Sequence, residues 1–172
     1  MNVISRTHSV RPSSSASSPQ KSVAILSAGH AVCLHLERGL TLSTTDLRQI
    51  MLAAFGGSDA DGAWLWKDAY DACEVGQILF IRKFGTAIIR QGRAPGQSVA
   101  LLGKLTALLP SHTRRSDESQ ALQQLSTPLP LAFAAAHAAG ITATDTVLEP
   151  SAGTGMLAAF AEIARAGAVL NE

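Results

Sequence analysis

Residues 146–158 read TVLEPSAGTGMLA, and this stretch organises the end of the chain. Its first residues are apolar and β-prone and end in Glu149, whereas the residues from Met156 onward have a helix pattern. Between them, Gly153 and Gly155 predict a turn where a ligand can approach the backbone, because glycine has no side chain. The start of the following helix would offer unpaired N–H groups to a polar or anionic group. We therefore expect a strand, a glycine-rich turn and a helix around a nucleotide-like ligand.

Two ligand classes use this geometry. The spacing Gly153-x-Gly155-x-x-Ala158 fits the dinucleotide pattern G-x-G-x-x-G/A. A dinucleotide fold normally passes straight from the strand into its first glycine, but here Glu149 and Pro150 come first. A carboxylate at the strand end would repel a pyrophosphate. It would suit a ligand with an ammonium group and hydroxyls, which describes S-adenosylmethionine, although the glycine spacing alone does not separate the two classes.

Two segments carry a family resemblance. Residues 149–155 (EPSAGTG) resemble motif I of the class I methyltransferases, in the Asp/Glu-Pro-x-x-Gly-x-Gly form common among adenine-N6 DNA methyltransferases. Residues 123–128 (QQLSTP) are similar to the Gln-x-x-Thr-Pro motif that these enzymes place before motif I. The resemblance implies S-adenosyl-L-methionine as the cofactor, with the threonine near its carboxylate. The cofactor-binding residues that it implies are Thr127, Pro128, Glu149, Pro150, Ala152, Gly153 and Gly155.

The upstream segment also has an ordinary interpretation. Ser126 or Thr127 could cap a helix that runs from about Leu131 to Ala139, with Pro128 at its start. Taken alone, the segment would favour this interpretation. Its order and separation relative to residues 149–155 favour the cofactor motif instead.

A further acid extends the predicted site. Residues 168–172 (AVLNE) predict a second short strand that ends in Glu172. In nucleotide-binding βαβ units, a carboxylate about 20 residues beyond the glycine turn holds a ribose hydroxyl. We therefore add Glu172 to the predicted cofactor-binding residues, with a simply solvated terminal carboxylate as the alternative.

Composition narrows the class of protein. Of the 172 residues, 47% are hydrophobic and 5% are aromatic, and alanine is abundant, so we expect packed helices rather than a β-sandwich. The net charge of +1 gives no electrostatic argument for nucleic acid or membrane, and no apolar run reaches the roughly 18 residues of a membrane span. The histidines form no ligand cluster, and Cys33 and Cys73 have no paired spacing. We expect a cytoplasmic protein with reduced thiols, no metal and no membrane segment.

The chain divides into four predicted segments, and the expected fold class is mostly α. Residues 1–20 are serine-rich and predict a disordered leader. Residues 21–110 predict a helical module and residues 111–120 a polar linker. Residues 121–172 predict the start of a Rossmann-like α/β methyltransferase domain, with two parallel strands only.

Four or five helices are expected within the helical module, and four of them have defined spans. They cover residues 21–38, a span from Thr44 or Thr45 to Phe55, residues 60–89 with candidate breaks or kinks at Gly76 and Gly85, and residues 98–109.

The helical module has two features with competing interpretations. Trp64, Trp66 and Tyr70 could stack on bases, but an aromatic stripe at helical spacing more often fills a core. A basic patch could contact a DNA backbone, but it is more often a solvated face. Its members are Arg82, Lys83, Arg90, Arg93 and Lys104. The module, including residues 55–59 (FGGSD) and Trp64 to Ala72, also resembles the leader of bacterial proteins in which an adenine-type methyltransferase domain precedes a helicase domain of the strawberry notch kind.

The chain departs from the family in a way that bears on mechanism. Adenine-N6 enzymes hold the target amine with an Asn-Pro-Pro-Tyr/Phe motif, whereas no two prolines among these 172 residues are adjacent. We therefore predict no catalytic residue. We expect a fragment truncated after the second motif, which contributes part of the cofactor site, is inactive alone and reaches DNA only through the missing C-terminal part. The alternatives are a dinucleotide-binding oxidoreductase fragment and a helical interaction or DNA-binding module with a vestigial glycine turn.

Overall fold

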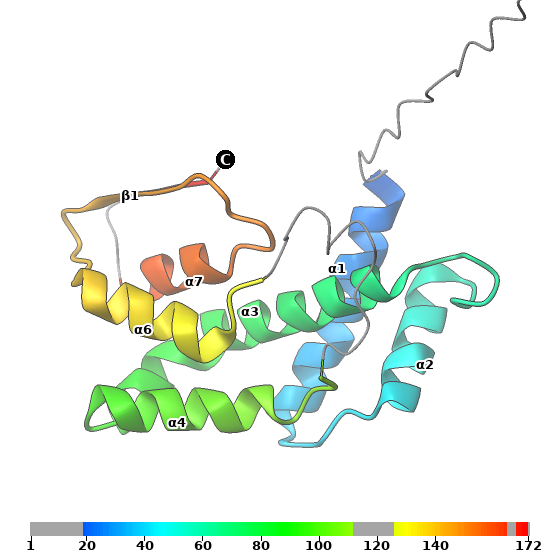
Figure 1. The fold of residues 1–172 in the computed structure, drawn as a ribbon, viewed down its shortest axis with the longest axis horizontal. Helices are drawn as coiled ribbons and strands as arrows, with labels where there is room; N and C mark the ends of the chain where they lie inside the picture. Colours follow the sequence, from blue (N-terminus) through cyan, green and yellow to red (C-terminus); the bar gives the residue numbers. More distant parts are fainter. Residues whose placement is uncertain (1–18, 112–125, 165–167, 172) are drawn as a thin grey trace, which may run out of the picture.

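The protein is mostly helical, as its composition predicted. The computed structural model describes residues 19–111, 126–164 and 168–171. The elements, in chain order, are α1 Pro19–Glu37, α2 Thr44–Phe55, α3 Trp66–Gln91, α4 Pro95–Thr106, α6 Leu129–Ala139, β1 Thr146–Glu149, α7 Met156–Ile163 and β2 Ala168–Asn171. Helix α3 runs through the middle of the molecule and α1 crosses it, while α4, α6 and α7 lie one above another beside α3 (Figure 1).

Helix α2 shows how local sequence fixes an element. The Ser43 hydroxyl accepts a hydrogen bond from the Asp46 N–H at 3.1 Å, and the Asp46 carboxylate accepts one from the Ser43 N–H at 3.1 Å. This capping box satisfies N–H groups that a helix start leaves free. Gly56 ends the helix in the left-handed region, with φ 70°. The predicted end at Phe55 is confirmed, but the cap is Ser43 rather than either following threonine, because Ser43 has the extended backbone of a cap.

Helix α3 begins later than the sequence predicted. The expected helix over residues 60–89 is wrong at its start, because Ser58 and Asp61 close a turn there with hydrogen bonds of 2.6 and 3.2 Å. Trp64 then lies buried in a non-helical segment, where its indole N–H donates to the Gly57 carbonyl at 3.1 Å. The helix starts only at Trp66.

Gly76 and Gly85 do not interrupt α3, which is continuous over Trp66–Gln91. The predicted breaks are therefore wrong, and the reason is packing. A Cβ at Gly76 would lie 2.6 Å from Cγ1 of Val32 on α1, and a Cβ at Gly29 of α1 would collide with α3. These glycines are small enough to let the two helix backbones approach closely, which is a different use of glycine from breaking a helix.

Three further boundaries differ from prediction. Helix α1 begins at Pro19, so the last two residues of the predicted leader 1–20 are helical, and the rest of that leader lies outside the described residues. Helix α4 begins at Pro95 rather than at residue 98, because proline suits the first helical turn. Helix α6 begins at Leu129, slightly before the expected residue 131.

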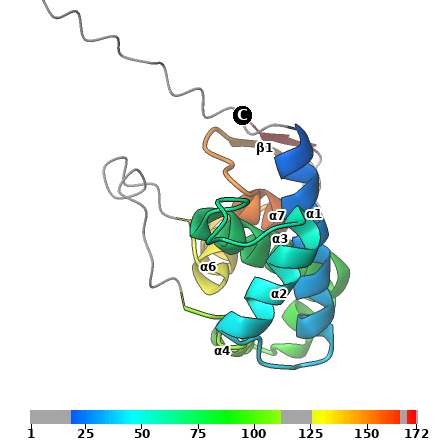
Figure 2. The same ribbon diagram turned by 90° about the vertical axis from the view of Figure 1, so that its right-hand side faces the viewer.

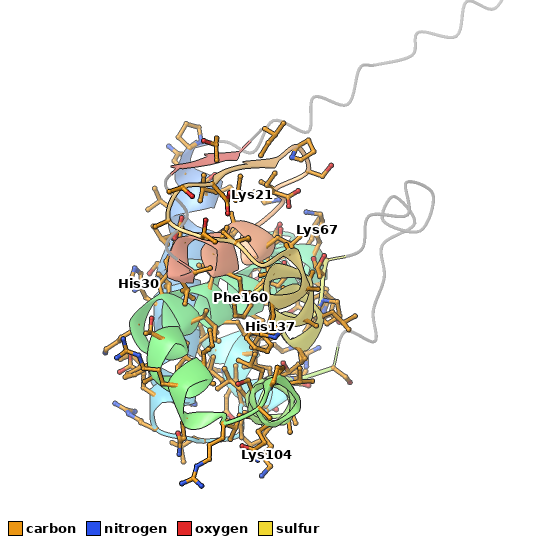
Figure 3. The ribbon with its side chains drawn as sticks, turned by 90° about the vertical axis from the view of Figure 1, so that its left-hand side faces the viewer. Lys21, His30, Lys67, Lys104, His137 and Phe160 are labelled. Atoms are coloured by element: carbon orange, nitrogen blue, oxygen red, sulfur yellow. The ribbon has the colours of Figure 1, made fainter. Side chains whose placement is uncertain are left out.

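The helical module and the C-terminal segment share one hydrophobic core. Phe160 of α7 packs edge-on against Phe133 of α6, with ring centroids 5.8 Å apart. Both rings belong to the same buried cluster as Val32 of α1 and Leu102 of α4. Figure 3 shows Phe160 in the interior, whereas Lys104 of α4 lies at the surface. Residues 112–120 of the predicted linker lie outside the described residues, but the helices on its two sides pack together.

Two short strands follow α6. β1 and β2 pair in parallel, with Thr146 opposite Ala168 and Glu149 opposite Asn171, and α7 connects them in the sequence. The strand pair and α4 lie at opposite ends of the molecule (Figure 2). The arrangement places the carboxyl end of β1 directly before the segment that the sequence predicted to bind a ligand.

Candidate functional site

The glycine turn, residues 150–155, joins β1 to α7. Gly153 has φ 55° and Gly155 has φ 93°, angles that residues with a side chain rarely adopt. The Gly155 N–H donates to the Ala152 carbonyl at 2.7 Å, and the Gly155 carbonyl accepts from the Ala159 N–H at 2.9 Å. Gly155 is therefore the N-cap of α7, and among the described residues no side chain caps this helix start.

Open space surrounds the two glycines. Among the described residues, a Cβ at Gly155 would meet nothing within 4 Å, and a Cβ at Gly153 would meet the Ser151 carbonyl at 3.9 Å. Gly153 is exposed, whereas Ala152 and Gly155 are half-buried. The backbone angles require glycine here, and the surroundings leave room for a ligand to lie against the backbone.

Glu149, the last residue of β1, turns its carboxylate back toward the glycine turn. Glu149 Oε1 accepts a hydrogen bond from the Ser151 N–H at 3.0 Å. The glutamate is half-buried and the following Pro150 is exposed. This bond engages an N–H of the turn that an anionic ligand would otherwise use, and it places a negative charge at the end of the strand.

A second carboxylate reaches the glycine turn from the helical module. Glu74 of α3 is 5% exposed, and its Oε2 accepts a hydrogen bond from the Thr154 hydroxyl at 2.8 Å. Sequence reasoning missed this residue. A signal was present, because Glu74 lies on the same helix face as the buried Gln77, Ile78 and Ile81, and a buried carboxylate needs a donor. The donor is 80 residues away in the chain, so the sequence did not identify it.

The other predicted cofactor-binding residues are Thr127, Pro128 and Glu172. Pro128 is the exposed N-cap of α6, and no side chain of the described residues caps that helix, so the alternative in which Ser126 or Thr127 forms the cap is wrong. Thr127 is half-buried, and α6 packs against α7, but Thr127 makes no hydrogen bond to the glycine turn within the described chain. Glu172 lies outside the described residues.

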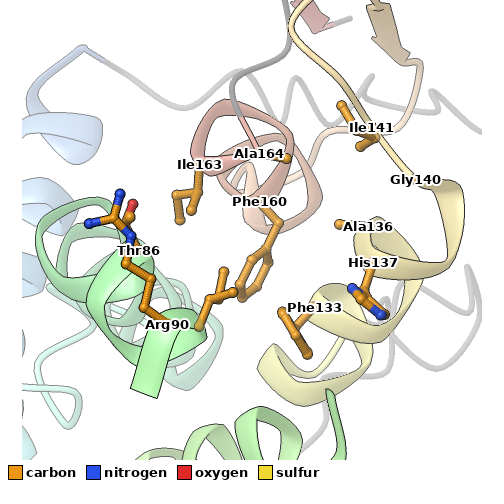
Figure 4. Close-up of a pocket in the computed structure, with 11 residues that line it drawn as sticks. Thr86, Arg90, Phe133, Ala136, His137, Gly140, Ile141, Phe160, Ile163 and Ala164 are labelled. Carbon is orange, nitrogen blue, oxygen red and sulfur yellow. The ribbon is translucent and has the colours of Figure 1, made fainter. Parts of the chain in front are cut away.

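A pocket of about 420 Å³ lies at the other end of α7, between the last turns of α3, α6 and α7 (Figure 4). Phe133 and Phe160 contribute apolar rings to its lining, which also includes Arg90 and His137. Helix α7 has eight residues, so its two ends are about 12 Å apart and the pocket is separate from the glycine turn. Arg90 lies in the last turn of α3, where its positive charge balances the exposed carbonyl ends of the helix.

The predicted basic patch is partly neutralised by acids from other elements. Arg82 donates two hydrogen bonds of 2.8 Å to Glu162 of α7, and these bonds raise the pKa of Arg82. Lys83 donates to Glu37 of α1 at 2.8 Å and lowers the pKa of that carboxyl. Two of the five cations are therefore engaged within the fold, which weakens the interpretation of the patch as a DNA contact.

The aromatic stripe is mainly structural. Trp64 is 2% exposed, and its ring lies edge-on to Trp66 with centroids 5.6 Å apart. The Trp66 ring in turn lies 5.9 Å from that of Tyr70, and the guanidinium of Arg48 sits 5.1 Å from the Trp66 centroid. The prediction that these rings fill a core is confirmed for Trp64.

The other candidate groups offer no reactive centre. Burial, with a smaller contribution from Glu37, raises the pKa of the Cys33 thiol to about 11, and burial raises that of Cys73 to about 12. Both cysteines are free and buried, as predicted. Within the described ranges, no group of three His, Cys, Asp or Glu residues could hold a metal ion, and no helix combines the length and apolar character needed to cross a membrane.

Comparisons of the chain with protein-family models, with curated proteins and with solved structures found no match. The functional interpretation therefore depends on the residues and the geometry described above. The resemblance of residues 123–128 and 149–155 to methyltransferase motifs stays a prediction.

Proposed function

We propose that residues 121–172 are the beginning of a Rossmann-like S-adenosyl-L-methionine-binding domain of the adenine-N6 DNA methyltransferase type. Three features support this proposal: the resemblance of residues 123–128 and 149–155 to two motifs of that family, the parallel pairing of β1 and β2, and the glycine turn at the carboxyl end of β1. In open α/β sheets, ligands bind just outside the carboxyl ends of the strands.

The negative charge at the glycine turn is the observation on which the choice between S-adenosyl-L-methionine and a dinucleotide depends. Glu149 engages the Ser151 N–H and Glu74 engages the Thr154 hydroxyl. A pyrophosphate would lie beside the Glu149 carboxylate, and two donors that could bind it, the Ser151 N–H and the Thr154 hydroxyl, are already in use. A ligand with an ammonium group and ribose hydroxyls would find acceptors instead. This favours S-adenosyl-L-methionine over a dinucleotide.

The glycine turn also suits such a ligand sterically. The space beside Gly153 and Gly155 is open, and the start of α7 lacks a side-chain cap among the described residues. In this proposal Glu149, Pro150, Ala152 and the two glycines bind the cofactor. Thr127 and Pro128 lie near its methionine end and Glu172 near its ribose, as the resemblance and the βαβ pattern imply.

The proposed role of this chain is binding rather than chemistry. When bound, S-adenosyl-L-methionine supplies an electrophilic methyl group. In such enzymes the rate comes from placing the target amine against that group, not from a nucleophilic side chain. The Asn-Pro-Pro-Tyr/Phe motif that orients the amine is not among the 172 residues. We therefore assign no catalytic residue, and DNA and a helicase domain are partners that the family resemblance implies.

Calorimetric titration with S-adenosyl-L-methionine and, separately, with NAD tests the ligand class. We expect weak binding of the first and none of the second. Gly153→Val should abolish binding, because a branched side chain would block the approach of the ligand and resists φ 55°. Gly103→Ala on α4 is the control, since its Cβ would meet no described atom within 4 Å. Preferential binding of NAD would support the oxidoreductase alternative, and binding of neither would support a helical interaction module with a vestigial turn.

A labelling experiment tests the predicted lack of activity. The purified chain, incubated with S-adenosyl-L-methionine labelled at its methyl group and with mixed-sequence DNA, should leave the DNA unlabelled. The physical reason is that nothing in this sequence matches the motif that holds the target amine. Labelled adenine would show that the helical module supplies the target-binding chemistry, and the assignment of roles would then be wrong.

A further inference from the structure

A hydrogen bond joins the helical module to the glycine turn. Glu74 Oε2 accepts from the Thr154 hydroxyl at 2.8 Å, and Glu74 is 5% exposed. A carboxylate with so little access to water needs hydrogen-bond donors inside the protein. The Thr154 hydroxyl is a donor that reaches it. The buried acid and the glycine turn therefore depend on each other.

Because of the position of Thr154, this hydrogen bond restrains the conformation of the glycine turn. Thr154 is flanked by Gly153 and Gly155, which both have positive φ and carry no side chain that could anchor the turn. Glycine loses more conformational freedom on folding than any other residue. A turn with two glycines thus needs contacts from outside to stay in one conformation, and a bond to the residue between them restrains both.

We propose that Glu74 is a positioning residue of the ligand site. By holding Thr154, it keeps the glycine turn in the conformation that receives the ligand, so the helical module is part of the site rather than a separate appendage. The identity of the ligand in this inference rests on the proposed function, whereas the ordering of the turn does not. Glu74 acts through Thr154 and has no assigned contact with the ligand.

The Arg82–Glu162 ion pair provides a matched control. It joins the same two helices, α3 and α7, through two hydrogen bonds of 2.8 Å. Glu162 lies in the last turn of α7, whereas Thr154 precedes its first turn. If Glu74 acts through its place at the turn, loss of the Arg82 pair should leave the turn unchanged.

Two substitutions at Thr154 separate the hydrogen bond from side-chain shape. Thr154→Val keeps the shape and removes the hydroxyl, while Thr154→Ser keeps the hydroxyl. Backbone amide hydrogen exchange over residues 151–157, measured by NMR without ligand, reports the order of the turn. An NMR titration with S-adenosyl-L-methionine gives the dissociation constant for each variant and for Arg82→Gln.

We expect Thr154→Val to speed exchange in the turn and to weaken binding, each by about tenfold, as for the loss of a hydrogen bond to a charged group. Thr154→Ser should stay close to the unsubstituted chain, and Arg82→Gln should not alter exchange in the turn. Because Thr154→Val takes a hydrogen-bond donor from a buried carboxylate, the double variant Glu74→Leu, Thr154→Val removes the carboxylate as well. Its turn exchange should stay fast while its global unfolding recovers.

The outcomes distinguish this inference from the proposed function. Unchanged turn exchange in Thr154→Val and in the double variant, or an equal increase in Arg82→Gln, would overturn the role of Glu74. If the unsubstituted chain binds no S-adenosyl-L-methionine but exchange follows the expected pattern, the proposed ligand is wrong and the positioning of the turn by Glu74 stands.

Discussion

The α1–α3 crossing and the glycine turn both depend on glycine, but they use different properties of it. At the crossing, a Cβ on Gly76 would lie 2.6 Å from Cγ1 of Val32, so the missing side chain lets two helices approach. At the turn, Gly153 and Gly155 have open surroundings and positive φ, so backbone freedom is what matters. At the helix crossing, glycine is needed because the backbones pack closely, whereas at the turn it is needed because φ is positive. Of these two regions, only the glycine turn leaves room for a ligand.

The largest expected effect comes from Phe160, which tests whether the two regions form one unit. Phe160 of α7 is 1% exposed and packs against Phe133 within the shared core. Phe160→Ala should lower the free energy of unfolding by about 3–5 kcal/mol, through lost burial and the cavity left behind. Denaturant unfolding should show one transition at lower denaturant. An unshifted transition of the helical module beside a separate, weakened one would contradict the shared core.

The next effect tests the packing role of glycine at the crossing. Gly76→Val should destabilise the protein by about 1–3 kcal/mol, because the added atoms would overlap Val32 and the Gly29 carbonyl. Gly103→Ala is the matched control on α4, where a Cβ meets open space, and it should gain up to about 1 kcal/mol of helix propensity. Thermal unfolding of both variants provides the measurement. Equal stability of Gly76→Val and the unsubstituted chain would show that close approach is not the reason for this glycine.

A smaller effect on stability is expected at the glycine turn. Gly155→Ala meets no steric obstacle but must adopt φ 93°, which costs about 1–2 kcal/mol. We expect this modest loss in denaturant unfolding, together with a clear loss of binding in a titration with S-adenosyl-L-methionine. A variant that unfolds like the unsubstituted chain would mean that the turn relaxes to another conformation at little cost.

The smallest effect on stability is expected at the N-cap of α2, which lies outside both the helix crossing and the glycine turn. Ser43→Ala should cost about 1 kcal/mol at neutral pH, as the loss of a helix N-cap. The hydrogen bonds from Ser43 hold the pKa of Asp46 below its ordinary value of 3.8. A lowered carboxyl pKa contributes stability above pH 3.8 that is lost as the pH falls through the folded-state pKa. The difference in melting temperature between the two proteins should therefore narrow in acid, and a constant difference would exclude a contribution from Asp46.

Much of the local structure could be predicted because its causes are local. The end of α2 before Gly56 and the turn at Gly153 and Gly155 follow from the backbone preferences of glycine. The start of α3 could not be predicted in the same way. The sequence predicted a helix that includes Trp64, but its indole bond to the Gly57 carbonyl holds it in a non-helical segment. That bond depends on how the preceding turn folds.

The same distinction between local and long-range causes applies to the candidate site. The sequence by itself determined a mostly helical chain, the position of the glycine turn and the acid at the end of β1, because caps, glycines and apolar periodicity act within a few residues. Only the tertiary structure decided that Glu74 meets Thr154 and that Arg82 meets Glu162, pairs that are each 80 residues apart. Such partners come together only when α3 and α7 pack on a common core, and no local pattern specifies which side chains will then face each other.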